Sequence, residues 1–511
     1  MKALIAQMKA ARACSTPLLA ITTPDQPAVV QGIVAEFKGT PVVSWDRVNG
    51  YMACNKEGKA ALAAWCQKAA VSPEDIPFGT AEPQAAMRLA VHFPAKTIIV
   101  AYSFNRWFRE DRPGEVIQAV LNLRDQYKGD QRTLVAIAPD FSLPPELQHD
   151  VILLDDPLPA DEGYAHIVSD LYEGAELKKP DAEITKQATR AVRGLSAFEA
   201  EQVLAMSIAS NSFKGLDLNE AWKLKQSAVG KIRGLTMTLD GPPLEDLRGL
   251  DQITKMLNGL WAGPTPPELV VRVDEIDKAM AGLGHGGGGG DTSGVSQDLH
   301  QNFLTSMEDN GWVGAILVGV RGSGKTVLTQ SIGAHHKVPT IAMDAGGMKG
   351  KYVGESEQVF REAFRTIKSI GGKRVLVLAT CNRLDMLPPE LLRRFKLQIW
   401  YFDLLTKEER DSLWPVYLKK FGHDPKSPRP NDEGWTGSEI RNCCEIAYML
   451  AQPVKEIGEQ YIVPITRSDM KNIESLRQQA EGRFLSASYP GTYQKAQMPV
   501  AEVPTSRKLG K

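Results

Sequence analysis

The sequence predicts an α/β protein that contains two sheets of parallel strands, each followed by a small helical region. Two observations predict this class. Short β-rich runs alternate with amphipathic helical segments over residues 1–160 and again over residues 241–405, and strands that alternate with helices pair in parallel. After each of these regions, at 161–240 and at 406–482, the pattern becomes helical. The repeated order of sheet and helices indicates a duplication.

Length, composition and charge indicate an ordinary globular protein of two or three domains. The chain has 511 residues, of which 43% are hydrophobic and 24% are charged. Its 60 basic and 61 acidic side chains leave a net charge of −1, so no global basic field favours nucleic acid as a partner. The six cysteines lack the spacing of a zinc site and are expected to be reduced thiols.

No targeting or membrane segment is expected. Lys9, Arg12 and a turn at 15–17 interrupt the apolar N-terminal stretch, which argues against a secretion signal. No apolar run approaches the length of a membrane helix, so we expect no membrane insertion. These features predict a cytoplasmic protein.

In the first region, five strands are expected to form a parallel sheet with helical crossovers. The crossovers are amphipathic, as at 115–127, where apolar residues recur at helical spacing. The helical region that follows is clearest at 197–208 and 218–232. The five expected strands are 17–23, 41–45, 96–102, 132–138 and 150–154.

The second region begins after a Pro/Gly break at 240–243 and is expected to hold a second parallel sheet. Its helical region is clearest at 407–420 and 438–451. A polar, proline-containing tail at 483–511 is expected to be a flexible arm or docking segment. The five expected strands are 269–273, 315–318, 340–343, 375–379 and 398–402.

A complete Walker A motif follows one of these strands and opens a helical segment. Its glycines allow backbone amides to close around phosphate oxygens, and the helix N-terminus adds its positive dipole end. Lys325 is expected to bridge the β- and γ-phosphates of ATP, and the Thr326 hydroxyl is expected to ligate Mg²⁺. The expected nucleotide-binding residues are Gly319, Val320, Arg321, Gly322, Ser323, Gly324, Lys325 and Thr326.

An acidic pair, Asp274 and Glu275, follows the apolar run 269–273 and lies upstream of the Walker A motif. The pair has the features of a Walker B motif. Asp274 is expected to bind the nucleotide site's Mg²⁺ through its water shell, and Glu275 is expected to polarise the attacking water. A solvated carboxylate pair at a strand end is the alternative, and the apolar residues before the pair disfavour it.

With these motifs, the second region resembles the AAA+ ATPases over roughly residues 240–480. Four further segments carry the resemblance. The segment 351–357, Lys-Tyr-Val-Gly-Glu-Ser-Glu, resembles the pore loop of the protein-remodelling clade, and 378–382 resembles sensor 1 at the end of a central strand. The segment 387–395, which contains two adjacent arginines, resembles the arginine-finger segment, and 436–440 resembles the start of a lid helix.

The resemblance implies roles for particular residues. Asn382 would orient the attacking water, and Gly437 would lie near the nucleotide. Arg393 or Arg394 would reach the γ-phosphate of a neighbouring subunit, with a solvated basic pair as the alternative. The Gly-Arg-Phe-Asp that usually follows in the family is missing, which leaves a second finger open. The pore-loop residues expected to contact a substrate polypeptide are Tyr352 and Val353.

The motif order differs from that of the family. AAA+ chains run from Walker A through the pore loop to Walker B and sensor 1, whereas here the block 268–310 precedes Walker A. Moved between Arg374 and Val375, that block would restore the family order. In the family sheet the Walker B strand lies beside the sensor 1 strand, which lies beside the Walker A strand. We therefore predict the same three-dimensional site with permuted strand connectivity.

The first region resembles an AAA+ domain that has lost its nucleotide chemistry. Where a Walker A motif would follow the first strand, residues 22–27 contain no Gly-Lys-Thr, and Pro27 lacks an amide donor. The third strand ends at Tyr102 and Ser103, without an acidic pair. No nucleotide binding is predicted here. A degenerate first domain before an active second one resembles a group of AAA proteins found in cyanobacteria, chloroplasts and phages.

The predicted fold is therefore two P-loop-type parallel αβα sheets, each with a helical lid, the first degenerate and the second permuted. The predicted function is hydrolysis of ATP to ADP and phosphate by a ring of identical subunits, expected to be a hexamer, that remodels or threads a protein substrate. ATP and Mg²⁺ are the expected ligands. Two alternatives remain: an ATP-controlled scaffold or switch with slow hydrolysis, and a nucleic-acid motor or loader, which the neutral charge disfavours.

Overall fold

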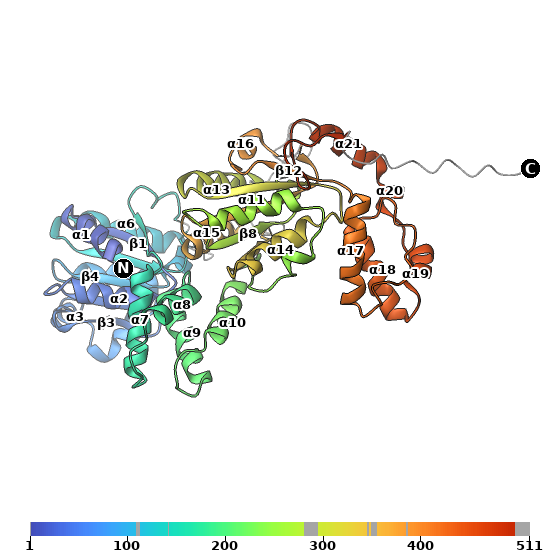
Figure 1. The fold of residues 1–511 in the computed structure, drawn as a ribbon. Coiled ribbons are helices and arrows are strands. Elements are labelled where there is room, and N and C mark those ends of the chain that lie inside the picture. The colour runs from blue at the N-terminus through green and yellow to red at the C-terminus, as the bar shows by residue number, and fades with distance from the viewer. Residues whose placement is uncertain are drawn as a thin grey trace, which may run out of the picture. The chain divides into compact units, whose positions relative to one another are not determined.

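The computed structural model describes residues 2–108, 113–141, 143–280, 295–344, 347–348, 355–384 and 387–495. The chain divides into two compact units, Met1–Ala221 and Trp222–Lys511, and each is described by itself (Figure 1). None of the described helices is both long and apolar enough to cross a membrane.

The first unit contains a six-stranded sheet in the order β3-β2-β4-β5-β1-β6. All five expected strands are present. The unexpected strand, β3, pairs antiparallel with β2, so the sheet is mixed rather than wholly parallel. A short turn joins these two strands, in which the Asp46 carboxylate accepts hydrogen bonds from the amides of Val48 and Asn49. The strands are β1 Leu18–Thr22, β2 Val42–Asp46, β3 Gly50–Ala53, β4 Ile98–Tyr102, β5 Thr133–Ala138 and β6 Ile152–Asp155.

Helices cover both faces of this first sheet. On one face, α1 and α2 bury their apolar sides against β1, β4 and β5. On the other, α3, α5 and α6 pack around an aromatic cluster that includes Trp45, Trp65 and Phe93. The α-helices up to the end of the first unit are α1 Lys2–Ala13, α2 Gln26–Glu36, α3 Lys56–Ala69, α4 Ile76–Gly79, α5 Pro83–Leu89, α6 Pro113–Asp130, α7 Asp161–Gly174, α8 Ala182–Val192, α9 Ala197–Ser210 and α10 Leu218–Gly230, the last of which crosses into the second unit.

The second unit contains a seven-stranded sheet in the order β13-β12-β9-β11-β8-β10-β7. The five expected strands form its parallel centre. The two edge strands were not expected: β7 is antiparallel to β10, and β13 is parallel to β12. The strands are β7 Leu235–Thr238, β8 Leu269–Val273, β9 Val313–Gly319, β10 Thr340–Met343, β11 Val375–Cys381, β12 Ile399–Phe402 and β13 Leu485–Ser486.

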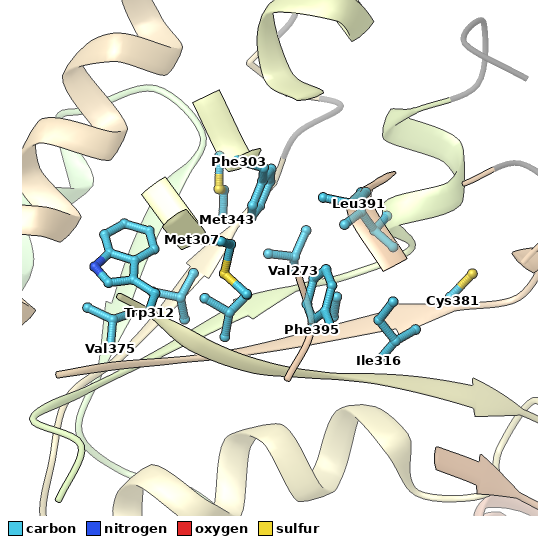
Figure 2. Close-up of a cluster of buried hydrophobic side chains, with 14 of the residues drawn as sticks. Val273, Phe303, Met307, Trp312, Ile316, Met343, Val375, Cys381, Leu391 and Phe395 are labelled. Atoms are coloured by element: carbon cyan, nitrogen blue, oxygen red, sulfur yellow. The ribbon is translucent and has the colours of Figure 1, made fainter. Parts of the chain in front are cut away.

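Two hydrophobic layers enclose the second sheet. One layer, part of which Figure 2 shows, joins Val273, Ile316 and Val375 of the strands to Phe303 and other side chains of α13 and α15. The opposite layer joins the alternate strand residues to α11 and α14. The helices of this unit after α10 are α11 Asp251–Ala262, α12 Ile276–Ala279, α13 Val295–Asp309, α14 Lys325–His335, α15 Glu355–Gly371, α16 Pro389–Leu392, α17 Lys407–Lys420, α18 Gly437–Leu450, α19 Val454–Tyr461, α20 Ile465–Ser468 and α21 Met470–Ala480.

The five parallel strands of the two sheets follow the same pattern in space but not along the chain. Their order is β6-β1-β5-β4-β2 in the first unit and β12-β9-β11-β8-β10 in the second. In the first unit β4 is the third of these five strands along the chain, whereas its counterpart β8 is the first of its set. The strand that carries the acidic pair therefore enters the sheet before the Walker A strand and still lies in the corresponding place.

The prediction of a flexible tail at 483–511 is wrong for its first part, because residues 483–495 pack against the sheet. β13 extends the sheet beside β12, and Tyr493 is buried and donates a 2.6 Å hydrogen bond from Oη to the Asp403 carboxylate. Asp403 is also paired with Arg477 of α21. Burial of aromatic side chains and a satisfied carboxylate hold this segment, and a polar composition alone does not reveal either. Residues 496–511 lie outside the described part of the chain.

Candidate nucleotide-binding site

The Walker A residues form a tight loop between β9 and α14 that requires its glycines. Gly319, Gly322 and Gly324 have φ angles of 147°, 79° and 94°, which L-residues with side chains rarely adopt. A Cβ atom on Gly319 would lie 2.1 Å from the Phe402 carbonyl oxygen, and one on Gly322 would lie 2.8 Å from the Thr436 hydroxyl. The loop therefore has no room for a side chain at Gly319 or Gly322, so its backbone can approach phosphate oxygens closely, as a phosphate cradle requires.

Lys325 begins α14 and is buried beneath this loop, with 8% of its surface exposed. Its Nζ donates hydrogen bonds of 2.8 Å to the carbonyl oxygens of Gly319 and Val320. Burial lowers the pKa of Lys325 to about 8, and the nearby Arg321 lowers the pKa further, against the opposing effect of Cys381, Asp277 and Glu275. An anionic ligand stabilises the charged form of a buried ammonium group of this kind, and the triphosphate of a nucleotide is such a ligand.

The first acidic residue, Asp274, directly follows β8. Its carboxylate lies 3.0 Å from Arg272 Nε and 3.5 Å from the Thr380 hydroxyl. Burial raises the pKa of Asp274, and both contacts oppose that shift. The Asp274 carboxylate is thus partly desolvated and partly neutralised by an arginine of its own strand.

The second acidic residue, Glu275, has a left-handed backbone, with φ 50° and ψ 52°. That conformation costs a non-glycine residue about 1–2 kcal/mol, and it is held by a 2.9 Å hydrogen bond from the Glu275 amide to the Thr380 hydroxyl. The carboxylate contacts Lys278 Nζ at 2.6 Å and accepts a 3.1 Å hydrogen bond from the Asn382 amide. The expected water-polarising and water-orienting side chains are therefore in direct contact.

Two residues outside the predicted set organise this contact. Thr380 of β11 binds both acidic residues, and Asp277, which is 5% exposed, accepts a hydrogen bond from the Asn382 backbone amide. Polar residues at the last positions of a buried strand, as in Thr380-Cys381-Asn382, are the signal that identifies Thr380. For Asp277, the signal is a third acid two residues after the pair.

The two candidate finger residues differ in their surroundings. Arg394 forms an ion pair with Glu308 of α13, and both side chains are 43% exposed. Arg393 is exposed, and among the described residues its side chain has no ion-pair partner. Arg393 is therefore the residue with the side chain available to a neighbouring molecule.

Helix α18, part of the region expected to be a lid, directs its N-terminus at the Walker A loop. Gly437 is its first residue, and the backbone amide and the hydroxyl of Ser438 each lie 3.3 Å from the Gly322 carbonyl oxygen. Thr436 and Glu439 close the helix end with a reciprocal capping box. Helix α18 therefore contacts the loop directly through Ser438.

The residues expected to hold Mg²⁺ suit an ion that is bound together with a nucleotide. Among the described residues, no three His, Cys, Asp or Glu side chains could hold a metal ion. Magnesium is commonly held by one or two protein oxygens plus substrate phosphates, which agrees with a site made of Asp274 and Thr326. The expected pore-loop residues Tyr352 and Val353 lie outside the described part of the chain.

The corresponding place in the first unit is filled by its own side chains. Asp25 caps α2 by accepting a hydrogen bond from the Ala28 amide, where the counterpart helix α14 has Lys325 and the glycine loop. Ser103 follows β4 with φ 49°, close to the φ of 50° at Glu275 after β8, and both its amide and its hydroxyl are hydrogen-bonded to Gln26. A carboxylate at this helix end disfavours phosphate.

The pKa of Lys325 predicts a pH dependence of ATP binding. The free site holds an increasing fraction of neutral lysine above pH 8, whereas bound phosphate favours the charged form. Binding should therefore take up a proton, and ATP affinity should fall by up to about tenfold per pH unit above pH 8. Titration with a fluorescent ATP analogue from pH 7.5 to 9.5 measures this. Lys325→Arg, if it binds, should give a flat profile, and a flat profile in the wild type would contradict the prediction.

Comparison with known proteins assigns a class to this architecture. Residues 4–155 match the model of the N-terminal domain of SpoVK-like AAA ATPases. Residues 315–371 match the model of the AAA family, the ATPases associated with various cellular activities. These matches support an AAA ATPase with a SpoVK-like N-terminal domain. Nucleotide binding is the general property that an AAA domain implies.

The similarity to some known proteins covers nearly the whole chain. The chain is 22% identical to the uncharacterized AAA domain-containing protein ycf46 of Guillardia theta, over 92% of this chain and 94% of the relative. The protein of the same name from Trieres chinensis is also 22% identical, over 92% of this chain and 96% of the relative. The proteasome-activating nucleotidase of Saccharolobus islandicus is 27% identical over 33% of this chain and 56% of the relative. The chain is thus similar to two ycf46 proteins over 92% of its length.

Proposed function

We propose that the second unit hydrolyses ATP to ADP and phosphate in a Mg²⁺-dependent reaction. One observation carries the proposal: Lys325, the acidic pair and Asn382 converge at the carboxyl ends of the neighbouring strands β9, β8 and β11. Ligands of open α/β sheets bind at this edge. The convergence occurs although the three segments lie far apart in the chain and in an unusual order.

Each side chain has a role that its surroundings favour. Lys325, already partly desolvated, would bind the β- and γ-phosphates. Thr326 and Asp274 would hold Mg²⁺, which when bound neutralises phosphate charge. Glu275 would accept a proton from the attacking water while Asn382 holds that water in line, since the two side chains are 3.1 Å apart.

We also propose that the strand connectivity of this unit is permuted relative to the AAA family. The first unit supports this, because its five parallel strands have the same spatial order with β4 in its usual place along the chain. The similar φ angles of Ser103 and Glu275 support the same equivalence. The family match also ends at residue 371, just before β11, where the Walker B strand would be expected in the family order.

The active form is proposed to be a ring, a hexamer of this chain, in which Arg393 completes a neighbour's site. The exposed Arg393 side chain supports this. A protein substrate, gripped by Tyr352 and Val353, is proposed from the sequence resemblance and from the partial similarity to the proteasome-activating nucleotidase. Stimulation of ATP turnover by an unfolded protein would test the substrate class.

A second candidate is an ATP-controlled scaffold or switch that hydrolyses slowly. One observation favours it: both carboxylate oxygens of Glu275 are engaged, one by Lys278 and one by Asn382. A base held in this way is less available to water. Assembly on ATP with negligible turnover would favour this candidate over the first.

The test of the nucleotide site is Lys325→Ala in the full-length chain. This variant should lose saturable binding of a fluorescent ATP analogue, because Arg321, the other charged side chain of the loop, is exposed, whereas Lys325 lies beneath the loop. Because the first unit is intact in this variant, its binding is tested at the same time. Residual micromolar binding would mean that the first unit holds nucleotide.

A further inference from the structure

A pocket of about 490 Å³ lies beside Asp274, on the face of the second sheet that α14 covers. Its wall includes Arg272 of β8, Ala342 of β10 and Thr236 of β7. In the sheet, Arg272 lies opposite Ala342, which lies opposite Thr236. On this side of Arg272 the residues in the row, Ala342 and Thr236, are small, so the space beside the Arg272 side chain is open there, whereas its neighbour on the other side is Leu378.

Arg272 is an unusual residue for this position. It lies between Val271 and Val273 in a buried strand, and its own side chain is only 17% exposed. Its Nε is 3.0 Å from the Asp274 carboxylate, yet this atom makes no well-aligned hydrogen bond among the described residues. The contact is thus mainly a charge pair. Without directed hydrogen bonds at Nε, the guanidinium can change partners readily.

Other carboxylates line the same pocket. Asp344 directly follows β10, whose last residue Met343 pairs with Val273, so it lies at the same end of the sheet as Asp274. Asp240 lies two residues after the antiparallel strand β7 and therefore at the opposite end of the pocket. Asp344 already accepts a 3.0 Å hydrogen bond from the Gly347 amide, which fixes its orientation. The pocket therefore has space for the Arg272 side chain and a carboxylate other than that of Asp274 with which it could pair.

We propose that Arg272 is a positioning residue that acts as the resident counter-ion of Asp274 and thereby sets the Mg²⁺ concentration that the site requires. The inference rests on the proposed function, which assigns Asp274 to Mg²⁺. A guanidinium and a divalent cation that share one carboxylate repel each other. With metal on Asp274, Arg272 would turn into the pocket toward Asp344, and the cost of that exchange would weaken metal binding.

The test is a Mg²⁺ titration of the full-length protein with a bound fluorescent ATP analogue. Arg272→Met removes the charge and keeps much of the side-chain volume, so the Mg²⁺ midpoint should fall about tenfold, while nucleotide binding in EDTA stays within about twofold. Binding of Mn²⁺, followed by electron paramagnetic resonance, should show the same shift without any turnover. Asp344→Asn should raise the midpoint, because Arg272 then lacks its second carboxylate.

A matched control is Arg374→Met. Arg374 pairs with Glu268 at the opposite end of the same strands, so its loss should leave the Mg²⁺ midpoint unchanged. If Arg272→Met does not fold, Arg272→Lys and Asp344→Asn decide the question, with Lys expected to keep the midpoint near the wild-type value.

An unchanged Mg²⁺ midpoint in folded Arg272→Met would overturn the inference. A raised Mg²⁺ midpoint would overturn it too, because it would mean that Arg272 holds Asp274 in place for the metal. If ATP turnover proves independent of Lys325, the proposed function fails and this inference fails with it. If turnover requires Lys325 and only the Arg272 result is negative, the inference alone is wrong.

Discussion

Replacing Glu275 with glutamine is expected to lower ATP turnover by about a thousandfold while leaving nucleotide binding intact. The glutamine side chain keeps the size of the glutamate and can still contact Asn382, but it cannot accept a proton from water. General-base catalysis of this kind contributes roughly 10²–10⁴-fold. Phosphate release gives the rate, and the fluorescent ATP analogue gives the affinity.

The matched control for this variant is Glu268→Gln, which removes a carboxylate just before the opposite end of β8, paired with Arg374. Its turnover should stay close to the wild-type value. Asp274→Asn should impair Mg²⁺-dependent turnover more than binding. Normal ATPase activity in Glu275→Gln would contradict the assignment of the acidic pair and, with it, the permuted site.

Arg393→Ala is expected to lower turnover by about 10³–10⁵-fold, the range that an arginine supplied by a neighbour contributes to γ-phosphate transfer. Arg394→Ala should have a much smaller effect. Arg394 is paired with Glu308 within its own subunit, and a surface ion pair of this exposure is worth at most about 1 kcal/mol. The two variants, measured side by side, separate a finger from a structural arginine.

Mixing subunits tests whether the arginine acts in trans. Arg393→Ala subunits retain an intact Walker A loop, and Lys325→Ala subunits retain Arg393, so a mixture should recover part of the activity that neither has alone. Wild-type activity per subunit should also rise steeply with protein concentration. A monomer that hydrolyses ATP at full rate, with no dependence on concentration, would exclude the ring.

The sequence predicted the class of each sheet and most of its parallel strands, because apolar strands and amphipathic helices leave periodic patterns that need no knowledge of the fold. The Walker A residues could be predicted for a related reason. Their function depends on a local loop, so that Gly319, Gly322 and Gly324 are required by backbone geometry within a few residues. The short edge strands β3, β7 and β13 were missed, because a strand of so few residues is too short to show a periodic pattern.

Only the tertiary structure decided which side chains meet. Residue 380 lies more than a hundred positions from the acidic pair, and the pairing of β8 with β11 brings Thr380 against Glu275 and Asn382 against its carboxylate. The same holds for Arg394 with Glu308, which distinguishes two adjacent arginines that look equivalent in the sequence. Local composition determines strands and loops. The contacts that set charge and orientation at the site depend on strand order, which arises only when distant segments share one sheet.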